Sequence, residues 1–178
     1  HPELHQFNLD NLKRILIEPL EGLYHPITSL SWMIDAHFFG LDPFYFHLQN
    51  VILHLINGVL LYFLITKLGF NRISANLGAL LFLVHPMAVE NVSWVSSRKD
   101  LLLGVFFLLS LISYIRYAEK SNVNRFLLLI LFFLLALLSK VAAVVLPLLF
   151  LLIGWYRERK IVKRSFISLI PFFLISLF

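Results

Sequence analysis

Long uninterrupted runs of apolar residues dominate the chain after residue 42. Stretches such as 51–65, 101–115 and 126–138 carry no Asp, Glu, Lys or Arg. Crossing a hydrocarbon layer of about 30 Å takes about 20 mostly apolar residues. The runs lack the alternation of apolar and polar residues that a transmembrane β-barrel needs. The pattern therefore predicts an all-α fold, a polytopic bundle of transmembrane helices.

About six crossings are predicted from where these runs begin and end. Asp42 followed by Pro43 is typical of a helix start, because the acid caps the helix and proline suits its first position. The predicted transmembrane domain covers residues 43–178, with spans at about 43–68, 73–84, 101–117, 126–138, 141–156 and 165–178. Since the chain begins with His1 and stops inside an apolar run, we expect both ends to be cut from a longer protein.

Residues 1–42 have a different composition, rich in His, Asp, Glu, Pro and aromatic residues. Asp10 is a candidate cap for a short helix with apolar residues on one face, and Thr28 or Ser29 for a second helix that stops at Gly40. We therefore expect an amphipathic extracytoplasmic loop segment that lies along the membrane surface.

Composition supports lipid as the solvent. The 178 residues are 60% hydrophobic and 14% charged, with a mean hydropathy of +0.85. These values lie outside the usual range of soluble domains. The protein is therefore expected to be an integral membrane protein.

The basic residues follow the predicted membrane topology, so the net charge of +5 does not imply a nucleic-acid partner. With six crossings, ten of the fifteen Lys and Arg residues fall on one side, which the positive-inside rule makes cytoplasmic. They are Lys67, Arg72, Arg116, Lys120, Arg125, Arg157, Arg159, Lys160, Lys163 and Arg164. A single helix over 126–153, about 42 Å long, would move the 157–164 cluster to the other side. A turn at Lys140 is predicted instead.

Eight of the ten acidic residues and all seven histidines then lie on the opposite, extracytoplasmic side or within the first two spans. The loop 85–100 puts several ionisable groups between two of the predicted spans. There Arg98 and Lys99 are candidates to clamp a phosphate. His85, Glu90 and Asp100 are candidates to position them or to carry protons. The alternative is a hydrated connecting loop whose basic side chains reach the membrane surface.

Lys140 interrupts a long apolar stretch, where an ammonium group needs a partner. That partner is a lipid phosphate, or else the lysine marks the end of a short span at the membrane surface. On the first span, His47, Asn50, His54 and Asn57 form one polar stripe at helical spacing. The stripe is either a cavity wall or proton path, or a set of interhelical hydrogen bonds worth about 0.6 kcal/mol each.

A metal site is not predicted. His25, His37, His47 and His85 match no known ligand spacing, and the absence of cysteine excludes thiolate ligands and disulfides. No phosphate-binding glycine loop, zinc-protease helix or nucleophile elbow is present. The motifs of soluble enzymes therefore do not assign a reaction.

Four ordered motifs resemble the membrane half of a known family. They are Tyr24 to Trp32 (YHPITSLSW), Gly40 to His54 with its GLDPF and FHLQN elements, His85-Pro86 to Arg98-Lys99-Asp100, and Leu137-Leu138-Ser139-Lys140. The chain resembles bacterial relatives of the transmembrane and tetratricopeptide-repeat O-mannosyltransferases, in the type-C glycosyltransferase superfamily. The similarity covers nearly the whole chain.

The resemblance implies an enzyme of the bacterial inner membrane that moves a sugar from a polyprenyl-phosphate carrier to an acceptor, often a protein Ser or Thr hydroxyl, at the extracytoplasmic face. No cofactor is implied beyond the lipid-linked donor. In the superfamily an acid in the first external loop is the catalytic base; it matches a stretch before His1, so no catalytic residue is assigned in this chain. The tetratricopeptide repeats of the family are absent, and Val141 stands where many eukaryotic relatives have an acid.

By similarity, the donor phosphate is expected at Arg98, Lys99 and Lys140. The expected cavity lining, including two histidines of the polar stripe, is His25, His47, His54, His85, Glu90 and Asp100. Two other functions remain open: a transporter or flippase whose polar stripe lines a pathway, and a noncatalytic membrane assembly subunit. A transporter is expected to show discontinuous helices around a midplane site, together with repeat symmetry.

Overall fold

The computed structural model describes residues 9–18, 24–158 and 163–176, and all regular structure in these ranges is helical. The elements are α1 (Leu9–Ile17), α2 (Pro26–Phe39), α3 (Pro43–Lys67), α4 (Arg72–Val84), α5 (Pro86–Ser93), the 3-10 helix η2 (Val95–Ser97), α6 (Arg98–Glu119), α7 (Val123–Ser139), the 3-10 helix η3 (Val141–Val145), α8 (Leu146–Glu158) and α9 (Lys163–Ser176). The all-α prediction is confirmed over these ranges.

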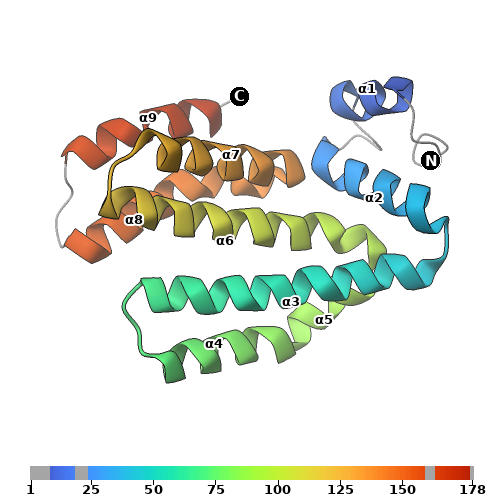
Figure 1. Cartoon of the computed structure of the whole chain (residues 1–178), viewed down its shortest axis with the longest axis horizontal. Helices are drawn as coiled ribbons and strands as arrows, with labels where there is room; N and C mark the ends of the chain where they lie inside the picture. Colours follow the sequence, from blue (N-terminus) through green and yellow to red (C-terminus); the bar gives the residue numbers. More distant parts are fainter. Residues whose placement is uncertain (1–8, 19–23, 159–162, 177–178) are drawn as a thin grey trace.

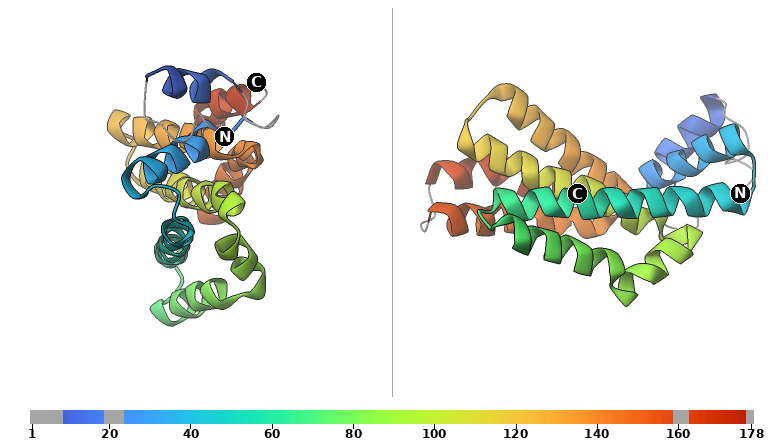
Figure 2. Two further views of the ribbon diagram at one scale, coloured as in Figure 1. Left: turned by 90° about the vertical axis from the view of Figure 1, so that its right-hand side faces the viewer. Right: turned by 60° about the horizontal axis from the view of Figure 1, so that its bottom comes forward.

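The two longest helices, α3 and α6, lie side by side in the middle of the bundle (Figure 1). Helix α4 packs on one side of α3, while α7 and α8 pack on α6. The views in Figure 2 show the same order from α4 through α3 and α6 to α7, α8 and α9, with α2 beside one end of α3. The polar stripe of α3 therefore lies within reach of α4 and α6.

Within the described ranges, two segments are long and apolar enough to cross a membrane: α3 and the 25 residues Val95–Glu119, which comprise η2 and α6. Helices α4 and α5 make a third candidate span if they count as one, although they are bent by 54°. Two shorter apolar helical segments, Val123–Ser139 and Val141–Arg157, follow. The number of six crossings stays a prediction.

Local sequence explains where the helices begin and end. The backbone N–H of Phe44 donates to Asp42 Oδ1 at 2.9 Å, so the predicted cap with Pro43 at the first helical position is present. At the α4–α5 bend, His85 has an extended backbone and its ring Nδ1 accepts from the Met87 N–H at 3.2 Å. The following proline has no N–H with which to continue α4.

The chain leaves α7 at Lys140, where the charge pattern places a turn. The backbone of Lys140 is extended, with φ −162° and ψ 137°, and η3 begins at the next residue. Helix α8 then packs on α6. Residues 126–153 are therefore not one continuous helix.

Close helix contacts depend on small residues and on aromatic rings. A Cβ on Gly58 of α3 would lie 2.6 Å from Leu83, so α3 and α4 approach closely at this position. Between α7, α8 and α9, the rings of Phe133, Phe150 and Phe172 are fully buried, with centroids 5.1 Å (Phe133–Phe172) and 5.6 Å (Phe150–Phe172) apart. This packing holds the shorter helices against α6.

Candidate functional site

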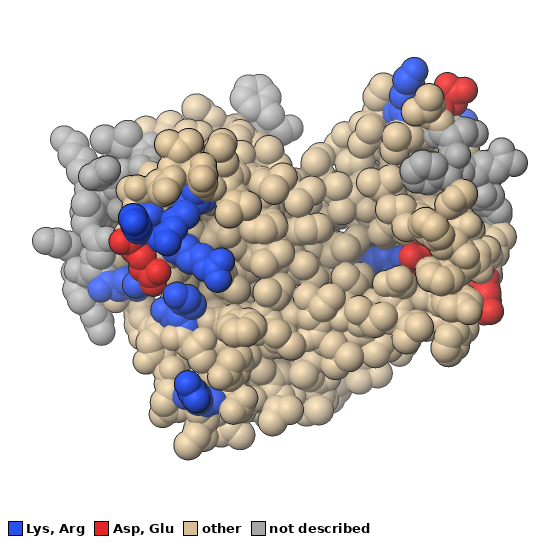
Figure 3. All heavy atoms as spheres, viewed as in Figure 1, with Lys and Arg blue, Asp and Glu red and all other residues tan. Residues whose placement is uncertain are grey.

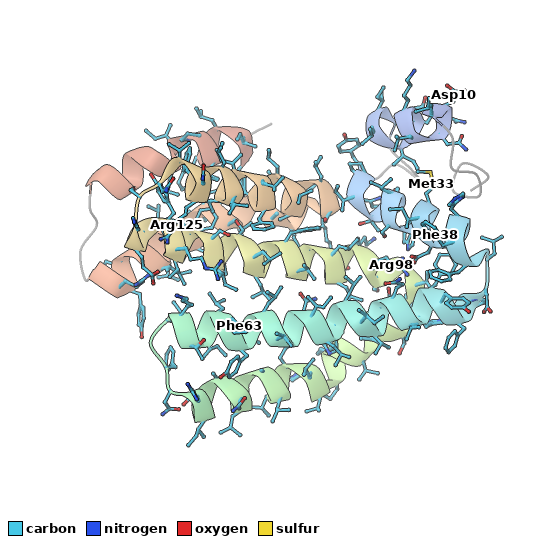
Figure 4. All side chains as sticks on the ribbon, viewed as in Figure 1. Asp10, Met33, Phe38, Phe63, Arg98 and Arg125 are labelled. Atoms are coloured by element: carbon cyan, nitrogen blue, oxygen red, sulfur yellow. The ribbon has the colours of Figure 1, made fainter. Side chains whose placement is uncertain are left out.

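Arg98, the first residue of α6, lies inside the protein (Figure 4). Its side chain is 2% exposed and forms an ion pair with Asp35 of α2. The Nε group donates to Asn50 Oδ1 at 3.1 Å, and Nη2 donates to the Phe46 carbonyl at 2.9 Å. The guanidinium also lies 5.6 Å from the centroid of the Phe46 ring. Arg98 thus joins α2, α3 and α6 at one end of the bundle.

Asp35 belongs to this cluster, and sequence analysis did not single it out. Its side chain is 6% exposed, and it follows Trp32, Met33 and Ile34 in the sequence. A carboxylate among apolar neighbours is itself a signal, because buried charges are paired in folded proteins. That signal indicates a partner without identifying it, since the partner is 63 residues away.

Lys140 forms an ion pair with Asp100, which joins the end of α7 to the first turn of α6. The Lys140 and Asp100 side chains are 39% and 27% exposed, so the pair is accessible from outside. The neighbouring Lys99 is half-buried, and its side chain makes no hydrogen bond or ion pair with another described residue. The Lys140–Asp100 pair therefore lies beside a helix N-terminus, which itself favours anions, and Lys99 adds a further positive charge in the same turn of α6.

A cavity of about 410 Å³ lies beside this ion pair, between α3, the α4–α5 bend and α6. Asp100, His54 and His85 contribute polar groups to its wall. Its lining is His54, Asn57, Leu81, Phe82, His85, Met87, Ala88, Asn91, Asp100, Leu101 and Gly104. The volume falls within the range of small-molecule sites, and Asp100 connects the cavity to Lys140.

The polar stripe of α3 makes contacts between helices. Asn50 Nδ2 donates to the Trp94 carbonyl at 3.0 Å, and Asn57 Nδ2 donates to the Leu101 carbonyl at 3.0 Å. The His54 Nε2 atom is 3.1 Å from the Leu83 carbonyl. These three side chains are buried, so they form the interhelical hydrogen bonds that were one of the two predictions for the stripe. His54 and Asn57 also line the cavity.

The remaining predicted lining residues lie apart from the cavity wall. His47 and Glu90 are exposed. His25, at the start of α2, is half-buried, with its Nδ1 atom 3.3 Å from Ser29 Oγ and its ring 6.0 Å from that of Trp32. The structure thus brings His54, His85 and Asp100 together.

A connection between α2 and α7 brings these groups close to the Arg98 cluster. The buried Thr28 hydroxyl donates to the Ser139 carbonyl at 3.4 Å, one residue before Lys140. Within the described ranges, no group of three His, Cys, Asp or Glu side chains lies close enough to hold a metal ion. The arrangement can bind an anion at Lys140 and a polar group in the adjoining cavity.

Comparison with known protein families identifies the family of this chain. The family model described as dolichyl-phosphate-mannose-protein mannosyltransferase matches residues 25–178, which include α2, the cavity and Lys140. The chain belongs to this family. The family resemblance expected from the four motifs is thereby confirmed.

Curated relatives include protein O-mannosyl-transferases from mammals. The chain is 40% identical to the mouse protein O-mannosyl-transferase TMTC1 over 98 residues, which is 54% of this chain and 10% of the relative. It is 36% identical to human TMTC3 over 99 residues, 56% of this chain and 11% of the relative. It is 35% identical to human TMTC4 over 113 residues, which is 56% of this chain and 15% of the relative. The chain thus spans about a tenth of the length of these relatives, and no solved structure matches it.

Proposed function

We propose that this chain is part of the membrane domain of a glycosyltransferase that takes mannose or a related sugar from a polyprenyl-phosphate carrier. The acceptor would be a protein Ser or Thr hydroxyl, in line with the names of the family and of its curated relatives. The observation that carries the proposal is the Lys140–Asp100 pair at the border of a cavity between apolar helices.

The two lysines would bind the carrier phosphate, which is the leaving group of the transfer. Negative charge grows on that phosphate in the transition state, and fixed ammonium groups stabilise it more than they stabilise the ground state. Lys140 is paired with Asp100, and the two side chains stay partly exposed, so that a phosphate can reach the ammonium group. The cavity with His54 and His85 would hold the sugar beside the phosphate.

Arg98 has a different part in this proposal. Its guanidinium is turned into the protein and compensated by Asp35, so it would position the start of α6 and thereby Lys99 and Asp100. The direct phosphate contact expected for Arg98 stays a prediction.

The membrane arrangement completes the proposal. Six crossings would place the Lys140 end of the bundle at the extracytoplasmic face of a bacterial inner membrane, with α1 and α2 along that surface. The catalytic base would lie in an acidic stretch that precedes position 1 of this sequence, as the family resemblance implies. Deleting that stretch from the full-length protein is expected to abolish transfer.

The testing experiment compares two lysine variants of the full-length protein in membranes. Lys140→Gln is expected to lower transfer of labelled sugar from polyprenyl-phosphate donors by about 100-fold, because one fixed charge at the leaving group is lost. Lys120→Gln is the matched control, since Lys120 directly follows α6 at the opposite end of the bundle. Equal transfer by both variants would refute a donor site at Lys140.

One observation favours a second candidate, a transporter or flippase. The α4–α5 pair is a discontinuous helix bent by 54° at His85, and broken helices are typical of transporters. Reconstituted vesicles separate the two functions. Movement of a labelled polyprenyl phosphate across the bilayer without an acceptor would support transport, whereas absence of both transfer and movement would favour a noncatalytic assembly subunit.

A further inference from the structure

A second and larger cavity lies at the other end of α3 and α6, away from the proposed donor site. It has a volume of about 580 Å³ and is formed by α3, α6 and α7. We call it the basic groove. Its lining is Leu60, Phe63, Thr66, Lys67, Leu109, Ile112, Ser113, Arg116, Arg125, Leu128 and Phe132.

The lining of the basic groove changes from charged to apolar along its depth. The lining segments are 60–67 of α3, 109–116 of α6 and 125–132 of α7, and each has a cation at one end. Because α7 runs back along α6, these three cations lie at the same end of the bundle (Figures 1 and 3). Seven residues of helix span about 10 Å, so the groove is about two turns deep.

The positive charge at the mouth is incompletely compensated. Glu119 lies 3.8 Å from the Lys67 ammonium and 3.3 Å from the Arg157 guanidinium. Arg125 donates to the Arg116 carbonyl at 2.6 Å. Among the described residues the Arg116 side chain has no ion pair or hydrogen bond. Among the described residues, the groove lining thus carries three cations, Lys67, Arg116 and Arg125, and the Glu119 carboxylate contacts only Lys67 of these three while it also pairs with Arg157.

A buried hydroxyl lies just below the charged mouth. Ser113, one turn before Arg116 in α6, is 7% exposed and lines the groove. Its hydroxyl makes no hydrogen bond with another described residue. Because Ser113 lines the groove, its hydroxyl can donate a hydrogen bond to a molecule bound there. Deeper in the groove the lining is apolar, with Leu60, Phe63 and Phe132 (Phe63 and Arg125 are labelled in Figure 4).

We propose that the basic groove binds one anionic glycerophospholipid of the leaflet at this end of the bundle. The phosphate would accept hydrogen bonds from Arg116 and Arg125 and lie near Lys67. An ester carbonyl would accept from Ser113, and an acyl chain would lie along Leu60, Phe63 and Phe132. The order of charged, hydroxyl and apolar groups in the groove matches that of phosphate, ester and acyl chain in the lipid. Basic pockets between membrane helices are a known kind of anionic-lipid site.

The occupant is a phospholipid rather than a polypeptide for two reasons. The two cations of the lining without an acidic partner among the described residues, Arg116 and Arg125, favour an anion, and the apolar depth of the groove favours a hydrocarbon chain. A membrane lipid supplies both in one molecule. The proposal concerns the end of the bundle opposite to Lys140 and does not depend on glycosyl transfer.

Native mass spectrometry of the full-length protein, purified in detergent and titrated with phosphatidylglycerol or phosphatidylcholine, tests the proposal. We expect the wild type to prefer phosphatidylglycerol and Arg116→Gln to lower its affinity about tenfold, as expected for a charge-assisted hydrogen bond. Arg72→Gln is the matched control, because Arg72 begins α4 at the same end of the bundle but does not line the groove. Leu109→Trp, which fills the groove and keeps its charges, is expected to lower binding of both lipids.

Three results would overturn the proposal. Equal losses in Arg116→Gln and Arg72→Gln would mean that the surface attracts anionic lipid without a site. Equal affinity of the wild type for both lipids would mean that the cations do not select the headgroup. No retained lipid in the wild type would mean that the groove is closed by another part of the full-length protein. Circular dichroism of each variant distinguishes loss of the site from loss of the fold.

Discussion

The ion pair between Asp35 and Arg98 makes a strong prediction for stability. Asp35→Asn keeps the size of the side chain but removes the charge that compensates a guanidinium only 2% exposed. The guanidinium keeps two neutral acceptors, Asn50 Oδ1 at 3.1 Å and the Phe46 carbonyl at 2.9 Å. Removing one partner of a buried ion pair lowers the free energy of unfolding by about 3–5 kcal/mol. We expect Asp35→Asn to lower the free energy of unfolding by an amount in that range.

The assay is equilibrium unfolding of the full-length protein in mixed micelles, with increasing dodecyl sulfate and far-ultraviolet circular dichroism as the readout. Asp42→Asn is the matched control. Asp42 caps α3 from an exposed position, and asparagine caps a helix as well as aspartate does. Its expected cost is below about 0.5 kcal/mol.

A double variant distinguishes a specific pair from general sensitivity of this region. Replacing both partners, as in Asp35→Leu with Arg98→Met, removes the uncompensated charge as well as the pair, and such replacements in other proteins are often neutral. We expect the double variant to be more stable than either single variant. Additive losses, or a cost of Asp35→Asn below about 1 kcal/mol, would refute the reasoning.

Three further changes test the close contacts and the accessible pair. Gly104→Ala would place a Cβ 2.8 Å from Asn57 Nδ2 and is expected to cost about 1–3 kcal/mol of unfolding free energy in the same assay. Asn57→Leu removes the hydrogen bond to the Leu101 carbonyl, and about 0.6 kcal/mol is expected from such interhelical bonds; a neutral result would show that the bond is not maintained in lipid. Lys140→Gln is expected to cost at most about 1 kcal/mol, because its ion pair is partly exposed; a larger loss would mean that its effect on sugar transfer reflects folding.

The helices were predictable from sequence where local signals determine them. The apolar runs indicated α3, α6 and α7, and the Asp42 cap preceded α3 in sequence and in structure. The turn at Lys140 followed from the positions of basic residues and not from helix propensity, since apolar residues continue on both sides. It could be predicted because membrane topology restricts the side on which charges lie.

The contacts of the candidate site were less predictable, because they join residues distant in the sequence. The Asp35–Arg98 pair spans 63 residues and the Asp100–Lys140 pair spans 40. Helical spacing indicated that Asn50, His54 and Asn57 share a face, but it left open whether that face meets water or protein. Packing of α4 and α6 on α3 decides this, because all three side chains are buried in the resulting contacts.

Sequence analysis expects Arg98, Lys99 and Lys140 together at the donor phosphate, but these three cations differ in burial and in whether an acidic partner compensates their charge. A cation that binds a ligand must be reachable and must have charge to offer. Arg98 is enclosed and paired with Asp35, Lys140 is 39% exposed and paired with Asp100, and Lys99 is half-buried with no acidic partner among the described residues. Losing Arg98 should therefore affect the fold first, whereas losing Lys99 should affect donor binding with little change in unfolding. Because Asp100 neutralises part of the Lys140 charge, an incoming phosphate must compete with that carboxylate, and Asp100→Asn should strengthen phosphate binding if Lys140 is its ligand.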